Sequence, residues 1–230
     1  MKISGFQKLT LLDFPEHTAC TIFTSGCNMR CPFCHNTPLV TGEAQEEFSE
    51  EEILSYLKKR QGILDGVAIT GGEPLLHKDI ADFIRKIKDA GYKVKLDTNG
   101  SRSGVLKALL DEGLVDFVAM DIKNTPGKYA LTSGSDIPYE EIAASIELIK
   151  QSGIPHEFRT TVVKEYHTEE DIISIAEMLG KSEKYYLQQF KDSGDILCEG
   201  CSAHPEKDLI KMAERASEHV LLCETRGVSR

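Results

Sequence analysis

The segment Cys27-Asn-Met-Arg-Cys31-Pro-Phe-Cys34 places three cysteines within eight residues, in the spacing C-x3-C-x2-C. The whole chain of 230 residues has only seven cysteines, so this density indicates a chemical role. Three thiolates on one loop can hold three irons of a [4Fe–4S] cluster and leave the fourth iron for a ligand that is not protein. A zinc site would need a fourth ligand, and His35 is badly placed because it directly follows a cysteine. The loop therefore predicts an iron–sulfur cluster held by Cys27, Cys31 and Cys34.

The segments on both sides of this loop indicate which kind of iron–sulfur protein the chain resembles. Thr10-Leu-Leu-Asp-Phe-Pro15 and Phe23-Thr-Ser-Gly-Cys27 precede it, Phe33 stands just before the third cysteine, and Cys34-His-Asn36 follows. Together these segments resemble the radical S-adenosylmethionine (SAM) enzymes, and among them the activating proteins of glycyl radical enzymes. The closest resemblance is to the activating protein of anaerobic ribonucleoside-triphosphate reductase, and it extends over most of the chain as far as Phe190.

Composition excludes several other classes of protein. The chain has 27 Lys and Arg against 37 Asp and Glu, a net charge of −10, which argues against a nucleic-acid partner or an anionic membrane surface. Its start lacks the apolar run of a signal peptide, and no stretch is long and apolar enough to span a membrane. An odd number of cysteines is also unlike a disulfide framework. We therefore expect a cytoplasmic protein with reduced thiols and without nucleic-acid or membrane partners.

Strands and amphipathic helices alternate along the chain. Strands are expected at 17–24, 66–70, 92–96, 115–120, 155–163 and 185–190, with a candidate seventh at 219–223. Strands separated by helices indicate right-handed βαβ units and a parallel sheet. Six such units predict an α/β fold, a partial (β/α)6 barrel, which is also the architecture that the resemblance implies. We expect one domain, with the barrel at residues 1–192 and a C-terminal extension at 193–230 packing on it.

Ligands of parallel α/β folds bind at the carboxyl ends of the strands. The residues at or just after the ends of the expected strands are Gly71, Gly72 and Glu73 at the second, Asp97 at the third, Asp121 and Lys123 at the fourth, and Gln188 and Gln189 at the sixth. A Gly-Gly pair after a strand is commonly a plain turn, but beside a cysteine loop it favours a ligand because glycine allows close backbone approach. The two aspartates could otherwise be helix caps or solvated rim charges.

The resemblance implies roles for several of these residues. Gly71, Gly72 and Glu73 would bind the amino group of SAM. Phe33 is expected to pack on the adenine because its flat apolar ring stands beside the third cysteine, although it could also be a loop anchor. Asp97, Asp121 and Lys123 would lie beside the SAM carboxylate, with Lys123 or a bound monovalent cation as the counter-charge of the two aspartates. Gln189 is the weakest cofactor-binding candidate. Arg159 could form an ion pair with Glu157 or with a rim carboxylate.

The C-terminal extension contains Cys198-Glu-Gly-Cys201, followed by His204 and Cys223. This set could be half a zinc site, part of a second cluster or a group of ordinary cysteines. The sequence leaves these alternatives open. Cys20, inside the first expected strand, is expected to be a core residue.

The resemblance also implies an activity that needs no side-chain catalyst. A reduced [4Fe–4S] cluster would cleave SAM, and the resulting 5′-deoxyadenosyl radical would take a hydrogen atom from a glycine of a partner enzyme. The expected partner is anaerobic ribonucleotide reductase, and the expected electron donor is a reduced flavodoxin- or ferredoxin-type protein. Three alternatives remain: activation of another glycyl radical enzyme of the pyruvate formate-lyase type, radical SAM chemistry on a small molecule, and a non-enzymatic electron-transfer module.

Overall fold

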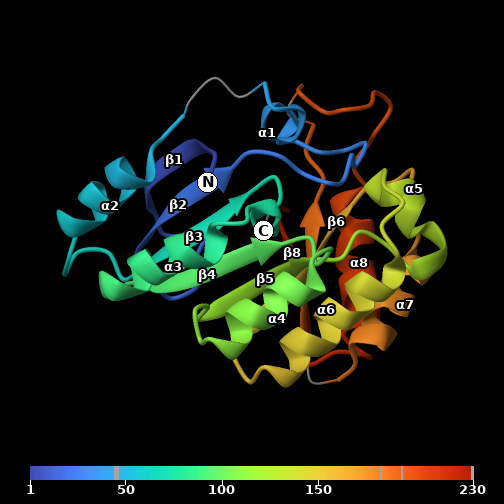
Figure 1. Ribbon diagram of the computed structural model, residues 1–230. Coiled ribbons are helices and arrows are strands. Elements are labelled where there is room, and N and C mark those ends of the chain that lie inside the picture. Colours follow the sequence, from blue (N-terminus) through green and yellow to red (C-terminus); the bar gives the residue numbers. More distant parts are fainter. Residues whose placement is uncertain (44–46, 182, 193, 229–230) are drawn as a thin grey trace.

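A computed structural model describes residues 1–43, 47–181, 183–192 and 194–228 (Figure 1). Within these residues one eight-stranded sheet runs in chain order. Its strands are β1 (Ile3–Thr10), β2 (Ala19–Thr24), β3 (Gly66–Gly71), β4 (Lys93–Thr98), β5 (Phe117–Asp121), β6 (His156–Val162), β7 (Lys184–Gln189) and β8 (Leu222–Arg226). β1 is antiparallel to β2, and every later pair is parallel.

The helices connect successive parallel strands and lie on the outside of the sheet (Figure 1). They are α1 (Thr37–Thr41), α2 (Glu50–Lys58), α3 (Ile80–Asp89), α4 (Ser103–Asp111), α5 (Tyr129–Ser133), α6 (Tyr139–Gln151), α7 (Glu169–Leu179) and α8 (Glu206–Ala216), with short 3-10 turns η1 (Pro74–Leu76) and η2 (Pro126–Lys128). Each strand from β2 to β7 is followed by a helix before the next strand begins. This arrangement confirms the predicted α/β fold with six β/α units.

The periodicity of each helix determines which of its side chains pack on the outer face of the sheet. α3 places Ile80, Phe83, Ile84 and Ile87 on one stripe, and all four are buried. Burial of each such side chain contributes roughly 1.5–3 kcal/mol relative to exposure. Gly91, which has a φ of +89°, follows the C-cap of this helix, as expected for a residue without a Cβ in the left-handed region.

Two helices, α2 and α7, begin with capping boxes. The Ser49 hydroxyl accepts from the Glu52 backbone N–H at 3.1 Å, and the Glu52 carboxylate accepts from the Ser49 N–H at 2.8 Å. Thr168 and Asp171 form the same reciprocal pair at the start of α7. Such caps typically contribute about 0.5–2 kcal/mol each, because they satisfy backbone donors that a helix leaves unpaired.

Both ends of the sheet differ from the sequence-based expectation. The antiparallel β1 was not predicted, because its residues mix polar and apolar types and no helix separates it from β2. The last strand begins at Leu222 instead of residue 219, and the apolar residues just before it include Leu221, which is 64% exposed. β8 pairs in parallel with β7, so the C-terminal extension is continuous with the barrel sheet.

Candidate functional site

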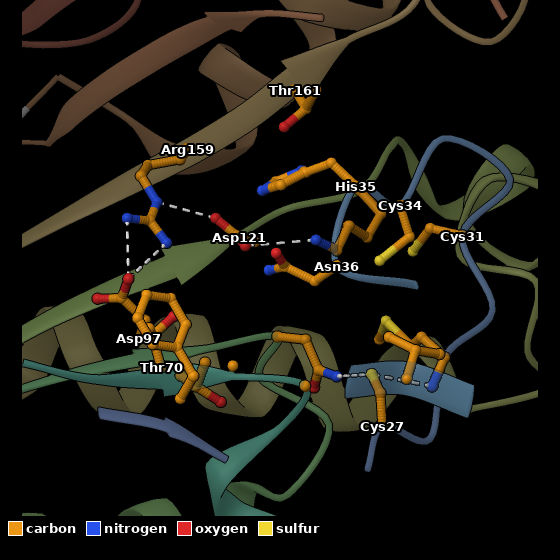
Figure 2. A pocket seen from close by; sticks show the side chains of 18 of the residues that line it. Cys27, Cys31, Cys34, His35, Asn36, Thr70, Asp97, Asp121, Arg159 and Thr161 are labelled. Atoms are coloured by element: carbon orange, nitrogen blue, oxygen red, sulfur yellow. Dashed lines mark hydrogen bonds and ion pairs between the residues drawn. The ribbon is translucent and has the colours of Figure 1, made fainter. Parts of the chain in front are cut away.

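The cysteine loop leaves the carboxyl end of β2 and lines one side of a pocket of about 310 Å³. Cys31 is buried, and Cys27 and Cys34 are partly exposed. Figure 2 shows the three cysteines on one side of the pocket, with Asp97 and Arg159 on the other. The Arg30 backbone N–H donates to the Ser133 carbonyl at 2.9 Å, which ties the loop to the end of α5.

Gly71 and Gly72 line this pocket, and they also hold β3 against the start of the cysteine loop. A Cβ on Gly72 would lie 2.0 Å from the Gly26 carbonyl oxygen, and one on Gly71 would lie 2.3 Å from the backbone of Thr24. The Gly72 and Glu73 N–H groups donate to the Thr24 and Gly26 carbonyls at 2.9 and 2.8 Å. The glycines therefore permit contact between two backbones, and these two amides already have protein partners.

Glu73 is fully buried and does not line the pocket. Its carboxylate accepts hydrogen bonds from the Leu75 N–H at 3.0 Å, the Thr98 hydroxyl at 2.8 Å and the Asn99 N–H at 2.7 Å. Burial raises the pKa of Glu73 to about 7, against the lowering effect of these three hydrogen bonds. This side chain therefore joins the ends of β3 and β4, and its place in the structure is that of a positioning residue.

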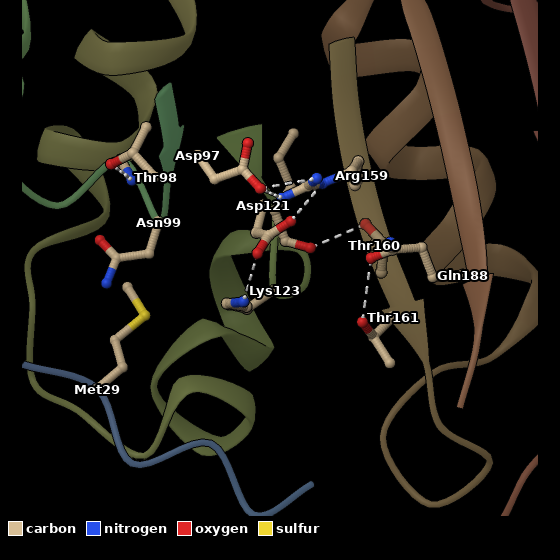
Figure 3. Close-up of polar contacts among 12 residues, drawn as sticks. Met29, Asp97, Thr98, Asn99, Asp121, Lys123, Arg159, Thr160, Thr161 and Gln188 are labelled. Carbon is tan, nitrogen blue, oxygen red and sulfur yellow. Dashed lines mark hydrogen bonds and ion pairs between the residues drawn. The ribbon is translucent and has the colours of Figure 1, made fainter. Parts of the chain in front are cut away.

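Asp97 and Asp121 lie together because Arg159 bridges them (Figure 3). The Arg159 Nε donates to Asp121 Oδ1 at 2.9 Å, and both terminal nitrogens lie 3.3 Å from Asp97 Oδ2. Lys123 Nζ is 3.4 Å from Asp121 Oδ2, and Lys95 forms a close ion pair with Asp97. Burial alone would raise the pKa of Asp121, but Arg159 and Lys123 outweigh it and hold that pKa below its usual range.

Two basic side chains, Lys123 and Arg159, provide counter-charge for these aspartates. Lys123 contributes, as the sequence suggests, but Arg159 contributes more to the Asp121 pKa and contacts both carboxylates. Glu157 is a minor partner, at 3.9 Å from Arg159. The register explains this arrangement, because Asp121 on β5 stands directly opposite Arg159 on β6. The alternation of residues along a strand could have indicated that Arg159 and Thr161 share the inner face.

Phe33 serves as a wall of the pocket and as an anchor of the cysteine loop. Its side chain is buried, and its ring centroid lies 5.9 Å from that of Tyr166 and 6.2 Å from that of His167. His167 in turn contacts the Lys123 carbonyl through Nε2 at 2.7 Å, and burial lowers the pKa of this histidine. The loop is thereby held to the segment that carries Lys123.

The two glutamines at the end of β7 face different surroundings. Gln188 lines the pocket, whereas Gln189, the candidate from the sequence, does not. The Gln189 Nε2 donates to the His204 carbonyl at 2.8 Å. Neighbouring residues of a strand point to opposite faces, so only one of the pair could face the pocket, and the sequence alone could not tell which.

The segment after β7 fastens to the cysteine loop. The Cys198 N–H donates to the Pro32 carbonyl at 2.9 Å, and the Thr37 hydroxyl contacts the Asp195 carbonyl. In Figure 1 this orange segment lies beside α1. Cys198 is exposed and Cys201 partly exposed, whereas Cys223 is buried and burial raises its pKa to about 12.

The spacing of the cysteines and other candidate ligands shows whether they fit a single metal ion or a larger cluster. Within the described part of the chain, no three His, Cys, Asp or Glu side chains are grouped so that they could hold a single metal ion. Cysteines that surround a cubane cluster stand farther apart than the ligands of one ion, because the cluster fills the space between them. The pocket is lined by all three cysteines of the loop, and thiolates are the ligands that such a cluster takes.

A sequence profile described as the radical SAM superfamily matches residues 21–179. This match covers more than half of the chain and includes the cysteine loop. The chain therefore belongs to the radical SAM superfamily, and this membership implies a [4Fe–4S] cluster and SAM as its cofactors.

Several relatives have more specific names. A Methanocaldococcus jannaschii protein with the provisional name glycyl-radical enzyme activating enzyme is 33% identical over 226 residues, which cover 95% of this chain and 92% of that protein. The pyruvate formate-lyase-activating enzyme of Clostridium pasteurianum is 27% identical over 64% of each chain. A Pyrococcus abyssi protein provisionally named GTP 3′,8-cyclase is 30% identical over 66% of this chain and half of its own length.

Solved structures share the fold at low sequence identity. A radical SAM methyltransferase from Sphaerobacter thermophilus superimposes with a TM-score of 0.75 at 12% identity, over 95% of this chain and 68% of that one. A domain of the pyruvate-formate lyase-activating enzyme from Bacteroides vulgatus has a TM-score of 0.58 at 19% identity, over 70% of this chain and 99% of that domain. At these identities the likeness concerns the fold alone.

Proposed function

We propose that this protein generates a glycyl radical on a partner enzyme. The observation that carries the proposal is the 33% identity to the M. jannaschii protein with that provisional name, which extends over 95% of this chain. Reductive cleavage of SAM at a [4Fe–4S] cluster supplies the 5′-deoxyadenosyl radical that such an activase uses to take a hydrogen atom from glycine. The rest of the work belongs to the side chains that bind, orient and shield these cofactors.

In this proposal Cys27, Cys31 and Cys34 hold the cluster, and the remaining pocket residues hold SAM. Gly71 and Gly72 offer backbone at the pocket wall beside the cysteine loop. Lys123 provides a positive charge for the carboxylate of SAM, and its ion pair with Asp121 holds the lysine in place. Buried apolar side chains such as Phe33 provide a flat surface for adenine and exclude water from the cluster side of the pocket.

Anaerobic ribonucleotide reductase is our first candidate for the partner. It rests on the resemblance of the segments Thr10–Pro15 and Cys34–Asn36 to the activating protein of that reductase. A reduced flavodoxin- or ferredoxin-type protein is the proposed electron donor, and the cytoplasm is the proposed site of action. In the described residues, no helix has the length and apolar character needed to cross a membrane.

A second candidate is radical SAM chemistry on a small molecule. It is favoured by the similarity to the P. abyssi protein provisionally named GTP 3′,8-cyclase, which covers 66% of this chain. The two candidates differ in their hydrogen donor, which is a glycine of another protein in the first and a free metabolite in the second.

The deciding experiment is anaerobic reconstitution of the cluster, reduction, and addition of SAM with and without a candidate reductase. We expect 5′-deoxyadenosine together with a glycyl doublet in the electron paramagnetic resonance spectrum when the reductase is present. Deoxyadenosine without the doublet would move the search to another partner or to a small molecule. Absence of both products from protein with a full cluster would contradict the proposal and favour an electron-transfer module.

A further inference from the structure

The three cysteines of the loop differ in what their sulfur atoms contact. The Cys27 Sγ accepts hydrogen bonds from the Asn99 side-chain Nδ2 at 3.7 Å and from the Met29 backbone N–H at 3.4 Å. Two dashed lines end on the Cys27 sulfur in Figure 2. No such donor to the sulfur of Cys31 or Cys34 is found among the residues that the structure describes. Cys27 is therefore the one loop cysteine, in this part of the chain, with a side-chain donor.

The donor group is held firmly in place. Asn99 directly follows β4, is 6% exposed and lines the pocket. Its backbone N–H donates to the Glu73 carboxylate at 2.7 Å, which fixes the main chain at this point. Its side-chain Oδ1 accepts from the Ser101 backbone N–H at 2.9 Å. Because the Ser101 N–H needs an acceptor, it must face Oδ1 and not Nδ2 of the Asn99 amide. This contact therefore sets the orientation of the amide and turns Nδ2 toward the cysteine loop.

The same Nδ2 group also bonds the loop itself. It donates to Asn28 Oδ1 at 3.1 Å, and the Asn28 Nδ2 in turn donates to the Ser101 hydroxyl at 2.8 Å. Two hydrogens are available on an amide nitrogen, so the contacts to Asn28 and to the Cys27 sulfur are compatible. The resulting path runs from buried Glu73 through Asn99 to a cysteine sulfur.

A hydrogen bond to a ligand sulfur has a defined effect on an iron–sulfur cluster. Reduction adds negative charge that is shared with the sulfurs, so an N–H donor stabilises the reduced state more than the oxidised state. The effect is enlarged where water is excluded, because the local dielectric constant is low. Removing the donor would therefore make reduction harder without removing a ligand.

We infer that Asn99, positioned by Glu73, raises the reduction potential of the cluster through its hydrogen bond to Cys27. This inference rests on the proposed function, since it takes Cys27 as a cluster ligand. Asn99 is a positioning residue in this account, because it acts through the cysteine. It would ease the electron transfer that precedes SAM cleavage.

The test is a redox titration of the reconstituted cluster in the absence of SAM, with the reduced form measured by electron paramagnetic resonance. In Asn99→Ala, we expect the ratio of reduced to oxidised cluster at a fixed solution potential to fall about two- to tenfold, the range for loss of one hydrogen bond. A tenfold fall corresponds to a midpoint about 59 mV more negative for a one-electron couple. Leaving SAM out separates this effect from any contact between Asn99 and the cofactor.

Two further variants make the test specific. Asn99→Asp keeps the volume and the Oδ1 acceptor but puts a carboxylate oxygen in the place of the donor, so its potential should fall further than that of the alanine variant. Ser101→Ala removes the hydroxyl partner of Asn28 and keeps the backbone N–H that orients Asn99, so its potential should match the wild type. If the Asn99→Ala protein does not retain its cluster, the reduction potential of Asn99→Asp is compared with that of the wild type instead.

Two outcomes would be decisive against the inference. A full cluster with wild-type potential in both Asn99 variants would overturn it and leave the proposed function intact. A wild-type protein that takes up no iron and sulfide would overturn the inference together with the proposed function.

Discussion

The two faces of β4, β5 and β6 are built from opposite kinds of side chain, apolar on the outer face and charged on the inner one. The outer face, under the helices, carries the apolar residues Val94, Leu96, Val118, Met120 and Phe158. The inner face carries Lys95, Asp97, Asp121, Glu157 and Arg159, which pair with one another. The outer face stabilises the sheet by excluding water, whereas the inner face holds charges at fixed positions around the pocket. Folding and cofactor binding should therefore respond to different substitutions.

The largest expected effect is on the inner side of the barrel, at the cysteine loop. Cys31→Ala should lose the cluster and all cleavage of SAM, because one of three iron ligands is removed. Iron and sulfide content and 5′-deoxyadenosine production measure this. Cys198→Ala is the matched control, since this cysteine is exposed on the segment after β7 and should leave cluster content unchanged. Equal cluster content in the wild type and the Cys31 variant would contradict the assigned ligand.

On the outer face, Ile84→Ala should lower the free energy of unfolding by about 2–5 kcal/mol, because it opens a cavity under α3. Ile84 is fully buried, whereas Ile63 is 59% exposed and Ile63→Ala should change stability by less than about 0.5 kcal/mol. Urea unfolding of the cluster-free protein measures both values. A large loss of SAM affinity in folded Ile84→Ala protein would show that the two faces are not independent.

Gly72→Ala tests the contact between β3 and the cysteine loop. The added methyl group would meet the Gly26 carbonyl, and relieving such overpacking typically costs about 1–3 kcal/mol. We expect the loop to shift and cluster content or SAM affinity to fall, as measured by iron analysis and equilibrium binding. Gly104→Ala is the control, because nothing lies within 4 Å of a Cβ at that position. Normal cofactor binding in the Gly72 variant would mean that the loop adapts.

A smaller effect concerns the charges of the inner face. The pKa of Asp121 is lowered in the folded protein, so its contribution to stability is present above the unfolded-state pKa and is lost as the pH falls through the folded-state value. The free energy of unfolding should therefore decrease below about pH 5, and Asp121→Asn should flatten that dependence. Unfolding curves at several acidic pH values measure the slope, and identical slopes would refute the pairing.

The smallest expected effect is that of monovalent cations. Arg159 pairs with both carboxylates beside which a monovalent cation is expected. If this arginine supplies the counter-charge by itself, replacing potassium and sodium by choline should leave SAM affinity unchanged within about twofold. In Arg159→Ala protein, the same exchange should weaken SAM binding, because the freed carboxylates would then need a counter-ion. A strong cation requirement in the wild type would show that Arg159 does not replace the ion.

The sequence predicts the outer face of this molecule much better than the inner one. The stripe of Ile80, Phe83, Ile84 and Ile87 indicates its helix and its buried side, because that pattern depends only on local periodicity. The bridge from Arg159 to Asp97 and Asp121 depends on the register of three strands, which no local pattern contains. The same limit applies to Gln188, which lines the pocket next to the predicted Gln189, and to Asn99, whose place after a strand carries no local signal of a contact with Cys27.

The attachment of the late segment to the cysteine loop also has a consequence for synthesis. Asp195, which contacts Thr37 beside the loop, is made 158 residues later along the chain. At a translation rate of roughly 5–20 residues per second, the loop is made about 8–30 s before this partner segment. The contacts that fasten the cysteine loop to this segment can therefore form only after that interval.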